Sequence, residues 1–555
     1  MKNSAAALIV VLSLSNVLAQ APAPPRETTA PATGGGGRII GRVIAADTGN
    51  PLARARVQIS SPALSKQRQI TTDESGRYEA TELGAGRYKI SVSRPGFVSL
   101  EYGQTRPFQP GRDLELLEGQ TLDRIDFALS RGGVITGRIT DHNGEPQAGV
   151  QMHALRFSWR PSGARQLEPT SPGLFDRTLT DDLGQYRIYG LMPGTYIVTA
   201  GAAPGMMSMP EPAVQGVTYY PGTVNVDEAQ SVEVEIGQDV PVHFALTAAP
   251  LARVSGTIVD SGGRPVGWRQ LMLGSRTEVS VAMRSAGTTR PDGTFEIPRV
   301  APGNYTIEVS PVRSQPGDVE FVSFPIAVEG HDITDLMISM KPGATITGRV
   351  IWEGRSPQPF ATQRITVGAA DPRMSTATLV SGVGEGNGTV DAKDHFSIVG
   401  VHGHVVFHSS FIGRAEPWTL KAVRIGGADI TDVGYNVTSD IDGLEVVMTD
   451  RETRVSGTAK GERNQPATDY VVVILPSEVR PGVNPTRFIQ TAPPDQQGRY
   501  QVKGLPPGQY VAAAVESISR DGHYNPAFQK RMRSTAIPFT LEEGQQLVLD
   551  LQLMQ

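Results

Sequence analysis

The sequence predicts an all-β protein, built as a tandem array of about five β-sandwich domains after a signal peptide. Three observations carry this prediction. One strand pattern recurs five times, turn motifs follow it at matching spacings, and 61 glycines and 42 prolines leave no long stretch in which an extended helix could form. Short strands joined by tight turns are the alternative that such a composition favours.

The recurring strand has a glycine at its centre and reads RIIGRVI, VITGRIT, RVSGTIV, TITGRVI and RVSGTAK in turn. An aliphatic or small residue stands two positions before and two positions after each glycine. This period of two places the apolar side chains on one face, as a half-buried strand requires. The central glycines are Gly41, Gly137, Gly256, Gly348 and Gly457.

Two turn motifs follow the strand in four of the five repeats. The first is an aspartate, a glycine and then an aromatic residue, and the second ends in glycine, any residue and tyrosine. Aspartate and glycine favour tight reversals, so each motif predicts a turn that leads an aromatic side chain into the core. The structural turn residues are Gly76, Tyr78, Gly86, Tyr88, Gly184, Tyr186, Gly194, Tyr196, Gly293, Phe295, Gly303, Tyr305, Gly498, Tyr500, Gly508 and Tyr510.

The spacing of these motifs divides the chain into five sandwiches, of which the fourth diverges because its turn at Asp394 lacks the glycine. Very short connections predict a stiff, rod-like string of domains. The predicted boundaries are 38–131, 132–250, 251–342, 343–451 and 452–555.

The N-terminal region predicts export. Residues 1–19 combine Lys2, an apolar stretch and a small-residue end at Ala19, which is typical of a signal peptide. Residues 20–37 form a linker rich in proline and glycine. We therefore expect a periplasmic, cell-surface or extracellular protein, with no membrane span once the signal is cleaved.

Composition narrows the function. The chain has no cysteine, which excludes disulfides and thiolate sites. Its formal net charge of -5 offers no attraction to nucleic acid.

Taken together, the glycine-centred strands and the two turn motifs resemble the carboxypeptidase regulatory-like domain, over most of residues 38–555. The resemblance implies Ig-like, transthyretin-like β-sandwiches related to the collagen-adhesin B repeat, in an array similar to those of exported bacterial proteins. It does not extend to a catalytic domain. With no nucleophile elbow or phosphate loop in the sequence, we expect no enzyme, no catalytic residue and no cofactor.

Three groups of residues have some features of metal sites, but we expect none of them to bind a metal. His142 and Glu145 have zinc-like spacing but lie in a predicted hairpin turn. Alternation would place His402, His404 and His408 on one strand face, without a carboxylate to complete a site. The aspartates of the recurring turns offer too few oxygens for calcium, so they are expected to cap turns.

Exposed aromatic rings are candidate glycan platforms, because flat rings stack on sugars. Phe157 and Trp159 lie in an insertion of the second repeat, and Tyr219 and Tyr220 precede a Pro-Gly turn of the same repeat. Packing of these rings inside the sandwich is the alternative. For the three remaining tryptophans, Trp268, Trp352 and Trp418, we expect core positions.

Three functions remain open at this point. The first is a non-catalytic scaffold and interaction protein whose partner is another envelope or secreted protein. The second is a carbohydrate-binding protein that holds a polysaccharide in its sandwich loops. The third is an accessory subunit of a secreted peptidase or transporter.

Overall fold

The computed structural model describes residues 36–61, 64, 66–104, 109–170, 178–201, 217–247, 250–277, 280–309, 320–358, 365–370, 387–411, 417–480, 482–519 and 521–554. The predicted signal peptide and nearly all of the predicted linker lie outside these residues. Five hydrophobic cores follow one another along the chain, spanning residues 39–129, 135–244, 252–340, 344–448 and 455–551. We number the corresponding β-sandwiches modules 1 to 5 and retain the boundaries given above as a proposal. The all-β prediction is confirmed.

Each module opens with a strand that is antiparallel to the strand after the aspartate turn and parallel to the closing strand. A second sheet packs against this one in modules 1 to 4, whereas in module 5 strand β45 pairs with both halves and joins them. The core lies between the two layers because alternate residues of each strand point inward.

Modules 1 and 2 contain nineteen of the described strands. Module 1 comprises β1 (Gly37–Ala45), β2 (Arg56–Ser60), β3 (Arg68–Thr71), β4 (Arg77–Leu83), β5 (Gly86–Ser93), β6 (Leu100–Glu101), β7 (Leu114–Leu116), β8 (Thr121–Leu122) and β9 (Phe127–Leu129). Module 2 comprises β10 (Gly133–Thr140), β11 (Gln151–Trp159), β12 (Arg165–Pro169), β13 (Thr178–Leu179), β14 (Gln185–Leu191), β15 (Gly194–Ala200), β16 (Thr218–Tyr219), η1 (Val226–Glu228), β17 (Ser231–Val234), β18 (Asp239–Pro241) and β19 (Phe244–Ala245).

Modules 3 and 4 follow the same plan. Module 3 comprises β20 (Ala252–Val259), β21 (Gln270–Thr277), β22 (Ser280–Thr288), β23 (Thr294–Val300), β24 (Gly303–Val309), β25 (Glu320–Val328), β26 (Ile333–Ser339) and β27 (Lys341–Pro342). Module 4 comprises β28 (Ala344–Glu353), β29 (Ile365–Ala370), β30 (Asn387–Thr389), β31 (His395–Val401), β32 (Gly403–Phe411), β33 (Thr419–Ile425), β34 (Ala428–Asp429), β35 (Tyr435–Val437) and β36 (Ile441–Thr449).

Module 5 adds a helix to the plan. It comprises β37 (Arg454–Lys460), η2 (Glu462–Asn464), β38 (Pro466–Ala467), β39 (Val471–Pro476), η3 (Pro485–Arg487), β40 (Gln490–Ala492), β41 (Arg499–Lys503), β42 (Gly508–Val515), η4 (Gly522–Tyr524), α2 (Pro526–Thr535), β43 (Ile537–Leu541), β44 (Gln546–Val548) and β45 (Leu551–Met554).

The glycine at the centre of each opening strand lies against a backbone carbonyl of the closing strand. A Cβ atom on Gly137 would lie 1.8 Å from the carbonyl oxygen of Val242, and one on Gly41 would lie 1.9 Å from that of Ile125. The other three central glycines have the same relationship to the closing strand. Only glycine allows so close an approach of the two strands.

The aromatic residue of the first turn motif reaches the same carbonyl. In module 2, the hydroxyl of Tyr186 donates a hydrogen bond of 2.7 Å to the carbonyl oxygen of Val242, and modules 1 and 5 repeat this bond. Their closing strands are interrupted at the acceptor. Modules 3 and 4 have Phe295 and Phe396 instead, and their closing strands β26 and β36 are continuous. The hydroxyl thus satisfies a carbonyl that the interrupted strand leaves without a ladder partner.

The tyrosine of the second turn motif closes its own turn. Tyr88, Tyr196, Tyr305 and Tyr510 each donate a hydrogen bond to the carbonyl four residues earlier, at 2.5–3.0 Å. Module 4 has the buried Val405 at this place, which fits its divergent turn sequence.

Modules 2 and 5 carry additional structure on the outer face of one sheet. In module 2 the β11–β12 hairpin extends beyond the sandwich and covers a small apolar cluster around Leu155. In module 5, α2 covers the outer face of β39 and β42, with Met532 fully buried against Val473 and Val511. A second apolar layer forms in each case.

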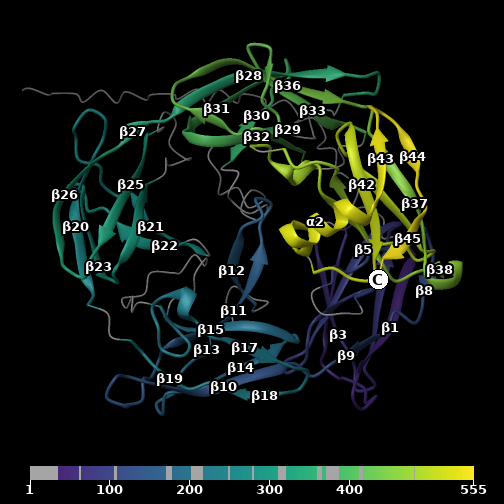
Figure 1. Ribbon diagram of the computed structural model, residues 1–555, viewed down its shortest axis with the longest axis horizontal. Helices are drawn as coiled ribbons and strands as arrows, with labels where there is room; N and C mark the ends of the chain where they lie inside the picture. The colour runs from purple at the N-terminus through teal and green to yellow at the C-terminus, as the bar shows by residue number, and fades with distance from the viewer. Residues whose placement is uncertain are drawn as a thin grey trace, which may run out of the picture.

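The five modules are arranged as a ring, with module 5 beside module 1 (Figure 1). The β11–β12 hairpin and α2 both lie toward its centre (Figure 1). The prediction of a rod is therefore wrong. Short connections do restrict neighbouring modules, but polar contacts between modules far apart in the sequence decide how the array curves.

Candidate functional site

A cleft of about 880 Å³ lies where the first and last modules meet. One wall is formed by the outward-facing residues of β5 and the segment leading into β7, and the other by β37, β41 and the turn before β41. Alternation explains these walls. Tyr88 is buried in the core of module 1, so its neighbours Arg87 and Lys89 face outward into the cleft.

The cleft is polar on both sides. Module 1 contributes Arg87, Lys89, Asp113 and Glu115, none of which forms an ion pair with any described residue. Module 5 contributes hydroxyl and amide groups, exemplified by Thr458 and Gln501, together with Arg499 and Asp550. Donors and acceptors are therefore both present, and the charges of the module 1 wall balance. Such a surface suits a hydrophilic ligand without large net charge.

Two residues of the second wall are already engaged. Arg499 pairs with Asp495 at 3.1 Å, and Asp550 accepts hydrogen bonds from the backbone and hydroxyl of Thr458 at 2.9 Å. These hydrogen bonds lower the pKa of Asp550 below its ordinary value. These contacts hold the Arg499 and Asp550 side chains of the module 5 wall in fixed positions before any ligand binds.

One ion pair directly joins modules 1 and 5, which form the two walls of the cleft. Nη2 of Arg112 lies 2.6 Å from Oδ1 of Asp469, and the arginine side chain is largely buried. A partly desolvated charged contact of this kind fixes orientation more than a fully exposed pair does. It holds the first module against the last.

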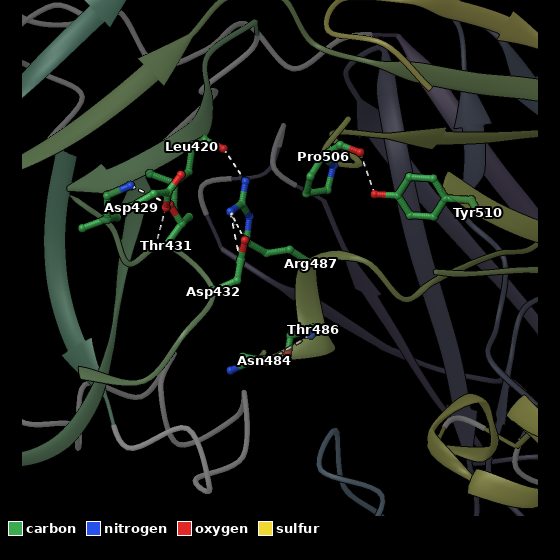
Figure 2. Close-up of polar contacts among 10 residues, drawn as sticks. Leu420, Asp429, Thr431, Asp432, Asn484, Thr486, Arg487, Pro506 and Tyr510 are labelled. Atoms are coloured by element: carbon green, nitrogen blue, oxygen red, sulfur yellow. Dashed lines mark hydrogen bonds and ion pairs between the residues drawn. The ribbon is translucent and has the colours of Figure 1, made fainter. Parts of the chain in front are cut away.

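A second junction joins modules 4 and 5 and is shown in Figure 2. The guanidinium of Arg487 contacts both carboxylate oxygens of Asp432 at 3.1 Å and donates to the carbonyl of Leu420 at 2.6 Å. Both charged side chains are mostly buried. Burial raises the pKa of Asp432, while the positive charge of Arg487 opposes that shift.

The same junction is held by main-chain contacts. The amide of Asn484 donates to the carbonyl of Asp432 at 2.6 Å, and the Asn484 side chain caps η3 by accepting from Thr486 at 3.0 Å. The cap positions Arg487 at the end of that turn of helix (Figure 2).

A lysine reinforces this junction from another side. Lys421 Nζ lies 2.7 Å from Glu353 of its own module and 3.0 Å from Glu543 of module 5. The two carboxylates raise the pKa of Lys421, and the lysine lowers that of Glu543.

Modules 2 and 5 also meet across the ring. The carboxylate of Asp521 accepts a 2.6 Å hydrogen bond from the backbone N–H of Trp159 and lies 3.3 Å from Nη2 of Arg156. Trp159 and Arg156 belong to β11, and Asp521 precedes η4 and α2. The two additions that distinguish modules 2 and 5 are thus in contact with each other.

The junction of modules 3 and 4 is aromatic. The rings of Phe321 and His402 stack with centroids 3.3 Å apart and planes 9° apart. Burial lowers the pKa of His402 to about 4. At neutral pH this histidine is therefore an uncharged packing residue.

The other two histidines of that segment, His404 and His408, do not take part in this stacking contact. His404 is exposed, and His408 is half-buried with a pKa lowered by burial. Within the described residues, no three histidine, aspartate or glutamate side chains are grouped to hold a metal ion.

The aspartates weighed earlier as metal ligands accept backbone hydrogen bonds within their turns. Asp141 accepts from the amides of Asn143 and Glu145 at 2.8 and 2.9 Å, so residues 141–146 form a hairpin turn. Asp181 accepts from the amides of Leu183 and Gln185 at 3.0 and 2.7 Å. These are the geometries of capped turns.

The four aromatic residues considered for glycan binding lie in three different places. Phe157 and Tyr219 belong to the apolar cluster outside the module 2 sheet, and Arg165 covers the Phe157 ring at 4.6 Å. Tyr220 packs edge-to-face on Phe244 of the module 2 core, at 5.9 Å. Trp159 is half-buried at the contact with module 5. That the four bind a glycan stays a prediction.

The core prediction for the remaining tryptophans holds for two of them. Trp352 and Trp418 pack edge-to-face at 4.8 Å in module 4, and their indole N–H groups donate to Asp394 and the carbonyl of Pro357. For Trp268 the prediction is wrong, because this side chain is 74% exposed. The preference of large aromatic residues for burial is a statistical tendency that a functional surface can override.

The fold defines the class of protein: a closed array of two-layered β-sandwich modules, each opened and closed by parallel strands. Residues 38–130, which span module 1, match the carboxypeptidase regulatory-like domain family, and this confirms the resemblance for that module. No helix in the described part of the chain is long and apolar enough to cross a bilayer.

Comparison with other proteins adds distant likenesses. No curated protein matches the sequence. Among solved structures, the TIE protein of Bacillus anthracis is similar at 10% identity, 71% coverage of this chain, 68% of that chain and a TM-score of 0.15. The minor pilin of Streptococcus agalactiae is similar at 15% identity, 38% and 97% coverage and a TM-score of 0.20. The major pilin subunit of Bacillus cereus is similar at 11% identity, 76% and 99% coverage and a TM-score of 0.14. Likeness at this level assigns no function.

Proposed function

We propose that the protein is an exported, non-catalytic interaction scaffold whose binding surface is the cleft between modules 1 and 5. The observation that carries this proposal is the contact of Arg112 with Asp469, which brings the first and last modules together around a polar cleft. A linear array would leave the two walls far apart. Export rests on the predicted signal peptide and the family resemblance.

The contacts at the other junctions support a preorganised surface. Arg487 with Asp432, and Asp521 with Arg156, restrain module 5 from two sides. A surface whose walls are already in place loses little conformational entropy when a ligand binds. Unpaired polar side chains at Arg87 and Lys89 are then available to a ligand.

The chemistry of the cleft favours a hydrophilic polymer with both hydrogen-bond donors and acceptors, for which a neutral polysaccharide is our first candidate. Balanced charges on the module 1 wall argue against a strongly charged polymer, which would meet as much repulsion as attraction.

Affinity electrophoresis in gels cast with neutral, acidic or basic polysaccharides tests this proposal on the full mature chain. We expect retardation in at least one neutral polymer, reduced several-fold by Lys89→Ser or Gln501→Ala. Thr195→Ala is the matched control, because Thr195 is exposed and occupies in module 2 the place of Arg87 in module 1. Retardation that both cleft variants leave unchanged, or its absence in every gel, would overturn the cleft as the binding surface.

A further inference from the structure

Trp268 lies between β20 and β21 of module 3 with a backbone φ of 62° and a side chain that is 74% exposed. A left-handed conformation is unfavourable for a bulky residue, because the side chain crowds the backbone there. Exposure of an indole adds the loss of a favourable burial. Tryptophan has the largest side chain of all residue types, and here it stands where neither the backbone conformation nor packing favours it.

The backbone around Trp268 is held firmly. Its N–H donates to the carbonyl of Thr289 at 3.0 Å, and the next amide, that of Arg269, donates to the Thr289 hydroxyl at 2.9 Å. Thr289 is 1% exposed. On the other side, a Cβ on Gly267 would lie 2.8 Å from the carbonyl of Pro291, so the loop packs closely on the β22–β23 turn. The indole projects from a rigid support.

The same support occurs in two other modules with different residues at the left-handed position. Arg54 has a φ of 59° and donates to the carbonyl of Thr72 at 3.0 Å, and Gly149 has a φ of 71° and donates to that of Thr180 at 2.9 Å. Each threonine hydroxyl accepts from the following amide, as Thr289 does. Glycine therefore suffices for the fold, and Trp268 is not required by it.

The surroundings of Trp268 indicate what it binds. Among residues 237–247, 250–274, 286–309 and 320–336, whose burial the structure describes, it is the one exposed large apolar side chain. The neighbouring turns carry the exposed arginines Arg264 and Arg290. A protein–protein interface is centred on a cluster of apolar residues, whereas one flat ring among polar groups matches a sugar, which has CH groups on one face and hydroxyls at its edge.

We propose that Trp268 is a carbohydrate-binding residue that stacks on a pyranose ring of a polysaccharide, with the flanking polar groups available to the sugar hydroxyls. This site lies in module 3 and does not depend on the cleft between modules 1 and 5.

Substitution by glycine separates binding from folding. Trp268→Gly places in module 3 the residue that module 2 has at Gly149, so its melting temperature should equal or exceed that of the wild type. In electrophoresis through gels containing hydroxyethylcellulose, xylan or dextran, the wild type should be retarded by at least one polymer. Trp268→Gly and Trp268→Ala should reduce that retardation at least about tenfold, whereas Trp268→Tyr should keep most of it.

Three outcomes would overturn the proposal. The wild type passes all three gels without retardation, Trp268→Gly is retarded as strongly as the wild type, or Trp268→Gly changes the sedimentation coefficient from dimer to monomer, which would assign the indole to contact with a second copy. The cleft is judged separately, because Gln501→Ala leaves Trp268 intact. Loss of retardation in one variant but not the other identifies which surface binds.

Discussion

The carboxylate of Asp521 accepts a 2.6 Å hydrogen bond from the backbone N–H of Trp159, although 362 residues separate the two along the chain. Arg156 lies beside the same carboxylate at 3.3 Å. The bond joins the β11–β12 hairpin of module 2 to the segment that precedes the helix of module 5. It is a direct link across the ring.

Removing this link should shift the ring toward an open arrangement. Asp521→Ala leaves the N–H of Trp159 and the charge of Arg156 without this acceptor, which costs about 1–3 kcal/mol at the interface. We expect a larger radius of gyration in small-angle scattering and an unchanged circular dichroism spectrum. Asp123→Ala is the control, because Asp123 is exposed and, among the described residues, pairs with its neighbour Arg124 alone. An unchanged radius of gyration would contradict this role for Asp521.

Loss of one hydroxyl should weaken module 2 locally. In Tyr186→Phe the carbonyl of Val242 loses its hydrogen bond, at a cost of about 1–2 kcal/mol. Hydrogen exchange followed by mass spectrometry should show faster exchange in β18 and β19, with the other modules unaffected. Tyr189→Phe makes the same chemical change at an exposed place on the same strand and should leave exchange as it is. Equal exchange in the two variants would count against the hydroxyl.

A methyl group on the central glycine should be far more costly than one on a turn glycine. Gly137→Ala places Cβ 1.8 Å from the carbonyl oxygen of Val242, so the opening and closing strands must separate, at about 3 kcal/mol or more. Gly144→Ala meets no atom within 4 Å and pays only for its φ of 87°, about 1 kcal/mol. Urea denaturation of both variants should show this order, and the reverse order would contradict the close approach.

Acid should destabilise the protein through buried histidines. Burial lowers the pKa of His153 and His523 to about 4, below the ordinary value of 6.5. The folded state therefore binds protons less readily than the unfolded state, so stability is complete above pH 6.5 and falls as the pH drops toward 4. For His153 alone the loss is on the order of 3 kcal/mol by pH 4.

Melting temperatures measured between pH 7.5 and 4 test whether stability falls as the pH drops. His153→Leu should flatten the profile, since it removes one of the groups that take up a proton on unfolding. Thr195→Ala, a change at an exposed side chain without an ionisable group, is the control and should leave the slope unchanged. A profile of His153→Leu as steep as that of the wild type would contradict the assignment.

The motifs of the sequence predict local structure well, and the reason is visible in particular residues. Gly137 and Tyr186 recur because each repeat has to bring its opening strand against its closing strand, and that requirement is local to one module. The acceptor itself, Val242, has no sequence signature, since any residue supplies a carbonyl. The repeated motifs therefore reveal the glycine and the tyrosine of this contact, but not the residue whose carbonyl they meet.

Two features were missed although the sequence contains a signal for each. Asn525 followed by Pro526 is a helix N-cap and first position, and Phe528 and Met532 lie one turn apart on the apolar face of α2. Trp268 follows Asp260 at the spacing at which Gly149 follows Asp141, and comparison of the two repeats would have placed the indole at a left-handed turn position.

Periodicity and turn chemistry by themselves determined the all-β class and the repeated sandwich motifs, because alternation of side chains and the conformations of glycine and proline act over a few residues. Only the tertiary structure decided that the array closes into a ring, that a polar cleft lies between its ends, and that Trp268 faces solvent. Those features depend on surfaces meeting across hundreds of residues, as Arg112 meets Asp469, and no local pattern encodes which outward-facing charges will pair.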